Sequence, residues 1–523
     1  MTKTTSRTRV AFNKKMYLTL FFFTVSCFIT MYAQAPAITW QKTLGGTANE
    51  TAHSCIQTTD NGYLISGRTA SNDGDVTGNH GGFSDVWVVK LDSSGALEWQ
   101  NALGGPGSEL SIDTKQTIDG GYILIGRSDT NGGDVTGNHG LGDIWVVKLN
   151  TLGDLQWQKS LGGSNEDVGA DILQTADGGY IVIGTSESTD GDVSGNHGGK
   201  DIWIAKINVT GNIQWEKSLG GSGSDVATSI AKTTDGGYII GGESSSSDGD
   251  VSVNQGGVDY WIVKINNTGV IQWQETYGGS SQDTPISIKQ TSDEGYIGVG
   301  FTLSNDGDVS GNNGNYDVWV IKLDNTGNLQ WQKTLGGSDP DGGWDVIISP
   351  NGHYIVVGDS QSNNGDVSGN HGGQDLWIVH LDQVGNVLWQ KSMGGSFGEN
   401  AGGGQLTTDG GYIIGGGTAS NDGDVSGNHG GSDVWVVKLE TDPLGIFDNI
   451  VETYSMYPNP ASDIIQIKST TTIEKIVIYN GLGMLVLSEA NTNTVDVSSL
   501  AEGFYLVNVS SKNKTTVHKL IKN

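Results

Sequence analysis

The sequence has few cysteines, few prolines and few basic residues, and each shortage excludes a class of protein. Of 523 residues, 2 are Cys, 8 are Pro, and 28 are Lys or Arg against 58 Asp or Glu, a formal charge of −30. Such a chain lacks the clustered Lys and Arg that bind nucleic-acid phosphates or an anionic membrane surface. Only Cys55 lies beyond the N-terminal segment, which excludes a disulfide framework and a Cys-based zinc site. The 82 Gly and 15 Trp instead predict regular turns around a core rich in aromatic residues.

The N-terminus has the order of a secretory signal peptide. A basic, polar segment (1–16) precedes an apolar run (17–32) and the small-residue sequence Ala33-Gln34-Ala35. A membrane anchor is one alternative, but the run is short for a bilayer. A lipoprotein signal is another; it would use Cys27, but Thr24 stands where such signals usually carry Leu. We predict that residues 1–35 are a signal peptide and that the mature chain is exported without a transmembrane segment.

Three aromatic markers repeat through the chain, and the usual spacing is 58 residues. The first marker, in W-[QE]-x-x-[LYM]-G-G or close variants, is Trp40, Trp99, Trp157, Trp215, Trp273, Trp331 and Trp389. The second, in D-[VIYL]-W-[VI]-[VA]-[KH]-[LI], is Trp87, Trp145, Trp203, Trp261, Trp319, Trp377 and Trp435. The third, mostly in D-G-G-Y-I, is Tyr63, Tyr122, Tyr180, Tyr238, Tyr296, Tyr354 and Tyr412. The chain therefore contains seven copies of one unit.

Each unit has the pattern of four short strands joined by turns. In residues 225–280, for example, apolar runs alternate with the turns 235–237 and 266–269 and with one long polar loop. Seven such units predict an all-β fold, a seven-bladed β-propeller of four-stranded blades. A solenoid of stacked β-coils is the alternative, but antiparallel strands joined by tight turns suit a blade better.

The phase of the repeat predicts how the ring closes. The chain begins with a fourth-type strand at Trp40 and leaves the repeat after a third-type strand, 434–439. The last unit thus has no fourth strand after residues 434–439, and the fourth-type strand at Trp40 precedes the first complete unit. We therefore expect residues 37–44 to complete the last blade, which pairs two edges that would otherwise be exposed.

Two segments resemble known families. The string L-G-G-S-x-x-D, then D-G-G-Y-I-I-G-G and S-D-V-W-V-V-K-L-D-x-x-G-x-x-x-W-Q, is similar to the bacterial β-propeller repeat family of secreted proteins over residues 37–446. That resemblance implies a fold and export but no single activity.

The C-terminal segment has another composition, because the Trp residues and the 58-residue period stop after Leu439. Tyr457-Pro458-Asn459-Pro460, the later 496–505 segment and the terminal Lys519-Leu520-Ile521-Lys522 resemble the sorting domain of the Bacteroidetes type IX secretion system. The resemblance implies a small β-sandwich, contact with the secretion machinery, and release or attachment at the cell surface. The predicted organisation is a signal peptide (1–35), a propeller (36–446), a linker (447–455) and a sorting domain (456–523).

The long loop of each unit, S-x-D-G-D-V-[ST]-G-N-H-G-G-x-D, has the oxygen spacing of a calcium loop. Oxygen-bearing residues stand at positions 1, 3, 5 and 12, and Gly at position 6 lets the chain turn around a hard cation. The candidate calcium ligands in the three clearest copies are Asp190, Asp192, Ser194, Asn196 and Asp201; Asp306, Asp308, Ser310, Asn312 and Asp317; and Asp422, Asp424, Ser426, Asn428 and Asp433. The alternative is ordinary turn chemistry, in which these side chains bind loop amides.

A second loop carries one acidic residue per unit just before the innermost strand. These residues are Glu50, Glu109, Asp167, Asp225, Asp283, Asp341 and Glu399. They are candidates for a ring of carboxylates at one mouth of the central channel, where they would bind a cation. The alternatives are that each caps its own turn or pairs with the Lys of the third strand, such as Lys264.

The sequence contains little that indicates an enzyme. His80, His139, His197, His371 and His429 recur in one loop register, which indicates a role in the loop, and no Walker A, G-x-S-x-G or H-E-x-x-H motif is present. A unique pair of carboxylates at the channel mouth would favour catalysis, and none is evident. The residues that break the repeat are Pro285, Pro340, Trp344, His353, His380 and Phe397. We expect a non-catalytic binding or structural module for glycan or protein, with calcium as a candidate stabiliser; the alternative is an extracellular hydrolase or lyase acting on polysaccharide.

Overall fold

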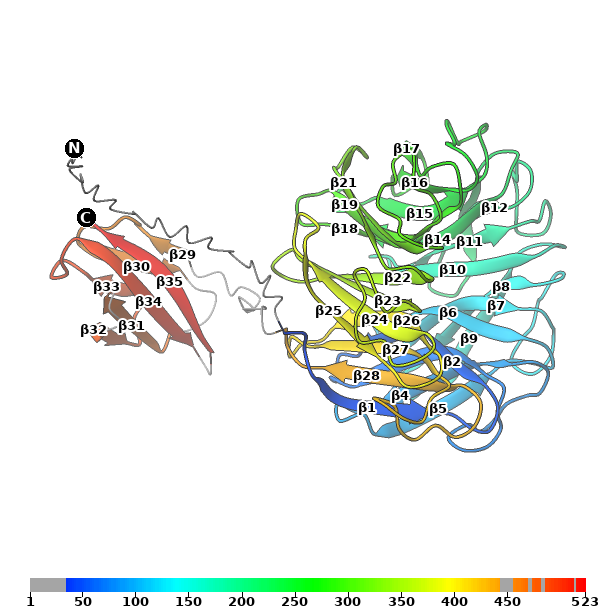
Figure 1. Cartoon of the computed structure of the whole chain (residues 1–523), viewed down its shortest axis with the longest axis horizontal. Helices are drawn as coiled ribbons and strands as arrows, with labels where there is room; N and C mark the ends of the chain where they lie inside the picture. The colour runs from blue at the N-terminus through cyan, green and yellow to red at the C-terminus, as the bar shows by residue number, and fades with distance from the viewer. Residues whose placement is uncertain (1–33, 443–454, 469–472, 481–484, 512–513) are drawn as a thin grey trace, which may run out of the picture.

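The computed structural model describes residues 34–442, 455–468, 473–480, 485–511 and 514–523 (Figure 1). All regular elements in these ranges are β-strands. The predicted signal peptide, apart from Gln34 and Ala35, and most of the predicted linker lie outside the described residues. In the part that is described, no helix is long and apolar enough to cross a membrane.

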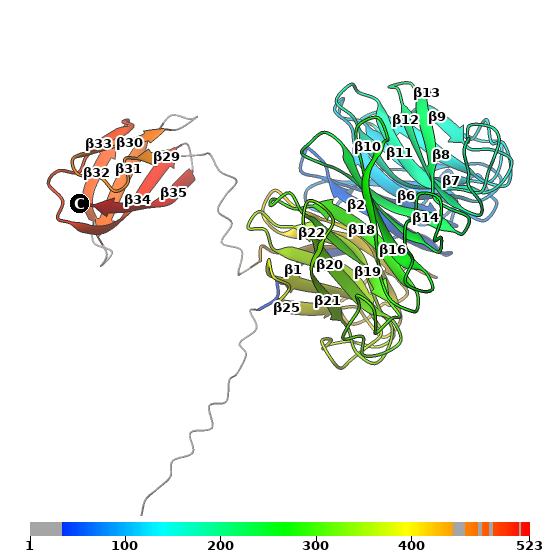
Figure 2. The same cartoon turned by 90° about the horizontal axis from the view of Figure 1, so that it is seen from above.

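Seven four-stranded antiparallel sheets make up residues 38–439, which confirms the propeller prediction (Figures 1 and 2). The first, innermost strands of blades 1 to 7 are β2 (Glu50–Gln57), β6 (Glu109–Gln116), β10 (Asp167–Gln174), β14 (Asp225–Lys232), β18 (Asp283–Gln290), β22 (Asp341–Ile348) and β26 (Glu399–Leu406). The second strands are β3 (Tyr63–Thr69), β7 (Tyr122–Ser128), β11 (Tyr180–Ser186), β15 (Tyr238–Ser244), β19 (Tyr296–Thr302), β23 (Tyr354–Ser360) and β27 (Tyr412–Thr418).

The two outer strands of each blade contain the Trp markers. The third strands are β4 (Asp85–Leu91), β8 (Asp143–Leu149), β12 (Asp201–Ile207), β16 (Asp259–Ile265), β20 (Asp317–Leu323), β24 (Asp375–Leu381) and β28 (Asp433–Leu439). The fourth strands of blades 1 to 6 are β5 (Leu97–Leu103), β9 (Leu155–Leu161), β13 (Ile213–Leu219), β17 (Ile271–Tyr277), β21 (Leu329–Leu335) and β25 (Val387–Met393).

The fourth strand of blade 7 is β1 (Ile38–Leu44), which lies beside β28 as the sequence predicted (Figure 1). Thr43 of β1 pairs with Trp435, the same register in which Thr334 pairs with Trp319 in blade 5. The indole Nε1 of Trp435 donates to Gln41 Oε1 at 2.9 Å. The N-terminal strand therefore supplies both the main-chain pairing and the side-chain partner that a local fourth strand would supply.

The core follows from the two Trp series. The third strands are buried along their whole length, as in β12 and β20, and their Trp side chains are at most 2% exposed. The fourth-strand Trp residues lie closer to the surface, except Trp389, which is 1% exposed. In most blades this Trp packs on the marker Tyr of the next blade; the ring centroids of Trp273 and Tyr296 are 5.7 Å apart. Aromatic pairs of this kind add about 0.5–1.5 kcal/mol beyond their buried area. The aromatic repeat thus holds the blades to one another.

Blade 7 meets blade 1 through glycines. A Cβ at Gly415 of β27 would lie 2.8 Å from the Cβ of Cys55, and one at Gly402 of β26 would lie 2.6 Å from the carbonyl oxygen of Ala52. Real Cβ atoms do not approach so closely, so the ring closes at this spacing only because these residues lack side chains.

The C-terminal domain consists of two sheets, in the strand orders β29-β30-β33 and β32-β31-β34-β35. Its strands are β29 (Ser455–Tyr457), β30 (Ile464–Lys468), β31 (Lys475–Asn480), β32 (Leu485–Ala490), β33 (Thr494–Asp496), β34 (Gly503–Ser511) and β35 (Lys514–Lys522). Buried residues of both sheets, including Ile465 and Ile476, form one core. The domain is therefore a small β-sandwich.

Candidate functional site

The long loops and the loops that enter each blade meet on one face of the propeller, here called the loop face. Asp190 Oδ1 accepts a hydrogen bond from the amide of Ser164 at 2.7 Å, and Asp192 Oδ2 accepts one from Gly162 at 3.4 Å. The same contacts recur for Asp306 with Ser280 and for Asp422 with Ser396. These backbone hydrogen bonds lower the pKa of Asp190, Asp306 and Asp422. Positions 1 and 3 of the candidate calcium loops therefore bind the entering loop of their own blade.

The other candidate calcium ligands have partners elsewhere in the loop. Ser194 Oγ donates to Glu216, Asn196 Nδ2 donates to the carbonyl of Ser186, and Asp201 Oδ2 accepts from the amide and Nδ1 of His197. In the part of the chain that the structure describes, no group of three or more His, Cys, Asp or Glu side chains is arranged to hold a metal ion. The contacts match the turn alternative, and calcium binding stays a prediction.

The recurrent histidines serve the loop, as their register predicted. The Nδ1 atoms of His80, His139, His197, His371 and His429 lie 2.6–2.7 Å from the Asp that begins the third strand of the same blade. All seven blades begin the third strand with Asp, including blades 4 and 5, where Gln255 and Asn313 replace the His and donate their backbone amides. In all seven, Oδ2 is bound to the loop, but Oδ1 is buried and has no hydrogen-bond partner among the described residues. The residues are Asp85, Asp143, Asp201, Asp259, Asp317, Asp375 and Asp433.

The predicted channel-mouth ring is buried. All seven of its residues are 0% exposed, and none lines the channel cavity described below. Asp225 is representative: its carboxylate accepts hydrogen bonds from the amide of Gly221 and the hydroxyls of Ser244 and Ser246. Each acid thus joins the entering turn to the end of the second strand. These contacts match the capping alternative, and cation binding by the ring stays a prediction.

The third-strand lysines pair with a different acid from the one considered in the sequence. Lys264, with 4% of its side chain exposed, lies 2.9 Å from Asp235 in the first hairpin turn of its blade. The equivalent pairs are Lys90–Asp60, Lys148–Asp119, Lys206–Asp177, Lys322–Asp293 and Lys438–Asp409. Six blades therefore carry one ion pair at the face opposite the loop face, here called the hairpin face.

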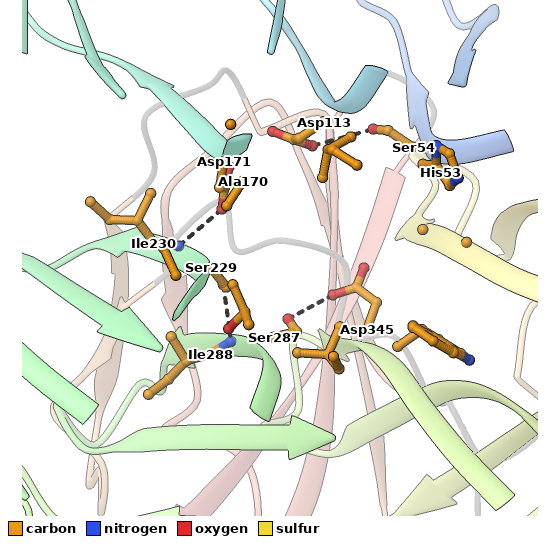
Figure 3. Close-up of a pocket in the computed structure, with 18 of the residues that line it drawn as sticks. His53, Ser54, Asp113, Ala170, Asp171, Ser229, Ile230, Ser287, Ile288 and Asp345 are labelled. Atoms are coloured by element: carbon orange, nitrogen blue, oxygen red, sulfur yellow. Dashed lines mark hydrogen bonds between the residues drawn. The ribbon is translucent and has the colours of Figure 1, made fainter. Parts of the chain in front are cut away.

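The central channel contains a cavity of about 1050 Å³ lined by the seven innermost strands (Figure 3). The fifth residues of these strands face it and form a polar belt. They are Ser54, Asp113, Asp171, Ser229, Ser287, Asp345 and Gly403. Neighbouring blades are linked through this belt: Asp171 Oδ2 accepts from the amide of Ile230 at 3.0 Å, and Ser287 Oγ donates to Asp345 Oδ1 at 2.9 Å.

Three carboxylates break the sevenfold pattern of the belt, and two lysines accompany them. Lys115 Nζ lies 2.7 Å from Asp113 Oδ2 and 3.5 Å from Asp171 Oδ1, while Lys289 Nζ lies 2.8 Å from Asp345 Oδ1. Burial raises the pKa of Asp171 to about 7; Lys115 opposes the rise, whereas the charge and hydrogen bond of Asp113 add to it. Burial lowers the pKa of Lys115, but Asp113 and Asp171 more than offset this, so the net shift is upward.

The sequence showed no pair of carboxylates that breaks the pattern, so Asp113 and Asp171 were missed. They line the channel cavity, whereas the acids that begin the innermost strands are buried and do not line it. Alignment of the seven innermost strands would reveal them, because Ser or Gly stands at the same position in blades 1, 4, 5 and 7.

Trp344 gives the channel wall an aromatic surface. Its side chain, 38% exposed, lines the cavity, and its Nε1 donates to Asp359 Oδ2 at 2.6 Å. Asp359 is 4% exposed, and burial raises its pKa to about 7 against the hydrogen bonds from Ala401 and Trp344. The buried carboxylate fixes the orientation of the indole.

The pattern-breaking residues of the sequence do not form one patch. Trp344 lines the channel, Phe397 is 63% exposed in a loop-face turn, and His353 and His380 contact one another at the hairpin end of blade 6. Among them, only Trp344 contributes to the channel cavity.

Comparisons with known proteins identify the C-terminal domain. Residues 455–523 match the family described as the secretion system C-terminal sorting domain. This domain is a type IX secretion sorting domain. The sorting domain implies contact with the secretion machinery and a secreted or outer-membrane-attached protein, as the motifs 457–460 and 519–522 predicted.

Similarity elsewhere in the chain is weak. A stretch of 191 residues is 24% identical to the regulatory protein FlaEY of Caulobacter vibrioides and covers 32% of this chain, and the match spans only 20% of that relative. The Pan2 WD40 domain of Neurospora crassa is similar with 9% identity and a TM-score of 0.37, over 64% of this chain and 89% of that one. A puromycin hydrolase is similar with 12% identity and a TM-score of 0.44, over 91% and 62%. These values carry no argument about activity.

Proposed function

We propose that this exported propeller is a non-catalytic module that binds a saccharide in its central channel. The observation that carries the proposal is the combination, in one cavity, of the exposed indole of Trp344 with the carboxylates that blades 2, 3 and 6 contribute to the polar belt. The other blades have Ser or Gly at that position. The cavity volume of about 1050 Å³ is at the upper end of the roughly 300–1,000 Å³ typical of ligand pockets.

The chemistry of the cavity suits a ligand rich in hydroxyl groups. An aromatic face stacks on the apolar face of a sugar ring, and Trp344 is held for such contact by Asp359. Carboxylates such as Asp113 and Asp345 retain free lone pairs beside their lysine partners, and can accept hydrogen bonds from hydroxyls.

The test is a glycan-binding screen of the full chain against neutral and acidic oligosaccharides. Trp344→Ile is a suitable variant, because Ile112 and Ile286 occupy the same position in blades 2 and 5. We expect Trp344→Ile to weaken binding about tenfold through lost stacking. Phe397→Ser, outside the cavity, is the matched control. Unchanged affinity in Trp344→Ile would contradict binding in the channel.

A second candidate function is hydrolysis or elimination on an extracellular polysaccharide, and the Asp113–Asp171 pair favours it. A carboxyl with a pKa of about 7, such as Asp171, can donate a proton near neutral pH. Asp171→Ser restores the belt residue of blades 1, 4 and 5, so we expect this variant to fold. Release of reducing ends or unsaturated sugars by the native chain, with a loss of about 100-fold or more in Asp171→Ser, would establish catalysis.

A further inference from the structure

Blade 6 departs from the other blades at three positions that meet on the hairpin face. His380 replaces the buried Lys of the third strand, Asn351 replaces its Asp partner, and His353 replaces the glycine that precedes the marker Tyr. Blade 6 therefore lacks the ion pair that the other six blades share, and places two imidazoles there.

The positions 353 and 380 are neighbours in the fold. In blade 4, a Cβ at the equivalent Gly237 would clash with the carbonyl oxygen of Ile265 and would lie 2.7 Å from the ammonium nitrogen of Lys264. A side chain at this position therefore requires a shift of the backbone, and it occupies space next to the lysine head group of the other blades. His353 and His380 consequently stand at positions that contact one another.

The two rings face one another through nitrogen atoms. His353 Nδ1 lies 3.0 Å from His380 Nε2, and the ring centroids are 5.1 Å apart. Behind them, His380 Nδ1 lies 2.6 Å from Asp442 Oδ2, and the indole Nε1 of Trp389 donates to the same oxygen at 3.1 Å. Asp442 follows β28, so the chain leaving blade 7 contacts the His380 imidazole of blade 6.

This arrangement has the features of a two-histidine metal site. Two imidazole nitrogens bound to one tetrahedral Zn²⁺, each at about 2.0–2.1 Å, stand about 3.3 Å apart, which needs only a small opening of the observed contact. A ligating histidine usually has a carboxylate at its other ring nitrogen, and Asp442 Oδ2 lies at that place, 2.6 Å from His380 Nδ1, without the geometry of a hydrogen bond.

We propose that His353 and His380 bind a late-transition-metal dication of the Zn²⁺ or Cu²⁺ type, with Asp442 orienting His380. Imidazole suits these ions, whereas Ca²⁺ and Mg²⁺ prefer oxygen ligands. Two protein ligands leave the remaining coordination positions to water, reached through the half-buried His353. The five loop histidines also have a carboxylate at Nδ1, but among the described residues no second imidazole contacts them, as His353 contacts His380.

The experiment is titration of the full chain with Zn²⁺, monitored by calorimetry and by competition with a chromophoric chelator. We expect one specific equivalent of Zn²⁺ per chain. His353→Gly restores the residue of the other six blades and should abolish that equivalent. Asp442→Asn keeps both ligands and should weaken binding about 10–100-fold.

Two controls separate this site from metal that any acidic protein collects. His371→Asn places at a loop position the residue that blade 5 carries there, Asn313, and should retain the specific equivalent. The triple variant Asn351→Asp/His353→Gly/His380→Lys carries the residues of the other blades at all three positions, which restores their ion pair, and it should lose the specific equivalent. The proposal is overturned if the native chain shows no such equivalent, or if His353→Gly and the variant with the restored ion pair bind Zn²⁺ as the native chain does.

Discussion

At the scale of the residue, each Lys–Asp ion pair of the hairpin face joins a buried lysine to an exposed aspartate. Lys264 is almost fully buried, and Asp235, with 51% of its side chain exposed, binds it. The hydrogen bonds from Thr233 and Lys264 lower the pKa of Asp235 to about 2. The lysine also donates to the carbonyl of Ile265 and to Gln272 Oε1, so it retains two partners when the acid is removed.

Asp235→Ala should therefore destabilise the propeller moderately. Loss of a partner from a buried charge costs about 3–5 kcal/mol, and the exposure of Asp235 reduces this to about 1–2 kcal/mol. Equilibrium unfolding in urea measures the change. Asp324→Ala, in an exposed turn without a lysine partner, is the control; an equal loss in both variants would show that the ion pair contributes nothing.

The channel belt shows why its residues were missed in the sequence. In the innermost strands the pairing register shifts around the fourth residue, as between Gly169 and Asp171 in β10. Such a bulge interrupts the alternation of side chains. The fourth and fifth residues, Ala170 and Asp171, consequently both line the channel. A strict two-residue alternation of side chains would place only one of these two neighbouring residues in the channel.

At the scale of the element, the fold was predictable because its signal is repeated. Seven copies of the Trp and Tyr markers fixed the strand order, and the phase of the first copy fixed the place of β1. The partners of the buried acids were not predictable, because Asp225 and Ser246 become neighbours only through the turns that join their strands.

Closure by β1 has a testable consequence. Without residues 34–44, β28 would lose its ladder with β1 while keeping the one with β27, and Trp435 would lose its Gln41 partner, which leaves a long apolar edge exposed. We expect a chain with this deletion to associate or aggregate and to unfold with lower cooperativity. Size-exclusion chromatography with light scattering, together with urea unfolding, measures both effects.

Gln41→Ala is a milder test of the same closure. It removes the hydrogen bond from the Trp435 indole and the exposed one to Ser426 Oγ, for an expected cost of about 1–2 kcal/mol. Gln100→Ala, which removes the equivalent contacts with Trp87 and Thr77 inside blade 1, should cost the same. A much smaller loss in Gln41→Ala would mean that β1 is not firmly docked.

At the scale of the whole molecule, the acidic loop face still carries the calcium prediction. Binding that repeats in several loops adds up: at a calcium concentration ten times Kd, each site contributes about 1.4 kcal/mol, and three sites about 4 kcal/mol. Calcium should then raise Tm by several degrees, and chelator should reverse the rise. Superimposable melting curves with calcium and with chelator would contradict the calcium prediction and favour the alternative, in which these side chains only bind loop amides.

The buried carboxyls also give the propeller a pH dependence. Asp259 and Asp317 have pKa values raised to about 6, mainly by burial, and Asp171 and Asp359 have values of about 7. Since the unfolded value is about 3.9, the stability linked to these groups is full below about pH 4 and is lost as the pH rises through 6–7. In the opposite direction, Asp60, Asp177 and Asp235 have pKa values of about 2, and their contribution is lost as the pH falls from about 4 to 2.

The two sets of groups together predict that Tm is highest near pH 4 and falls on both sides, which thermal melts between pH 2 and 8 measure. Asp259→Asn tests the fall in Tm between pH 4 and pH 8, here called the neutral limb. Among the described residues, Asp259 Oδ1 has no hydrogen-bond partner, and it lies near Asp283 Oδ2, both within 2.7 Å of a Cβ built on Gly278. The amide of Asn can donate toward Asp283 and carries no charge, so this variant should melt about 2–4 °C higher at pH 8 and match the native chain at pH 4. The carboxyl of Asp324 has a pKa of about 2, so Asp324→Asn should leave the neutral limb unchanged. If Tm falls with pH in Asp259→Asn as steeply as in the native chain, the neutral limb belongs to other groups.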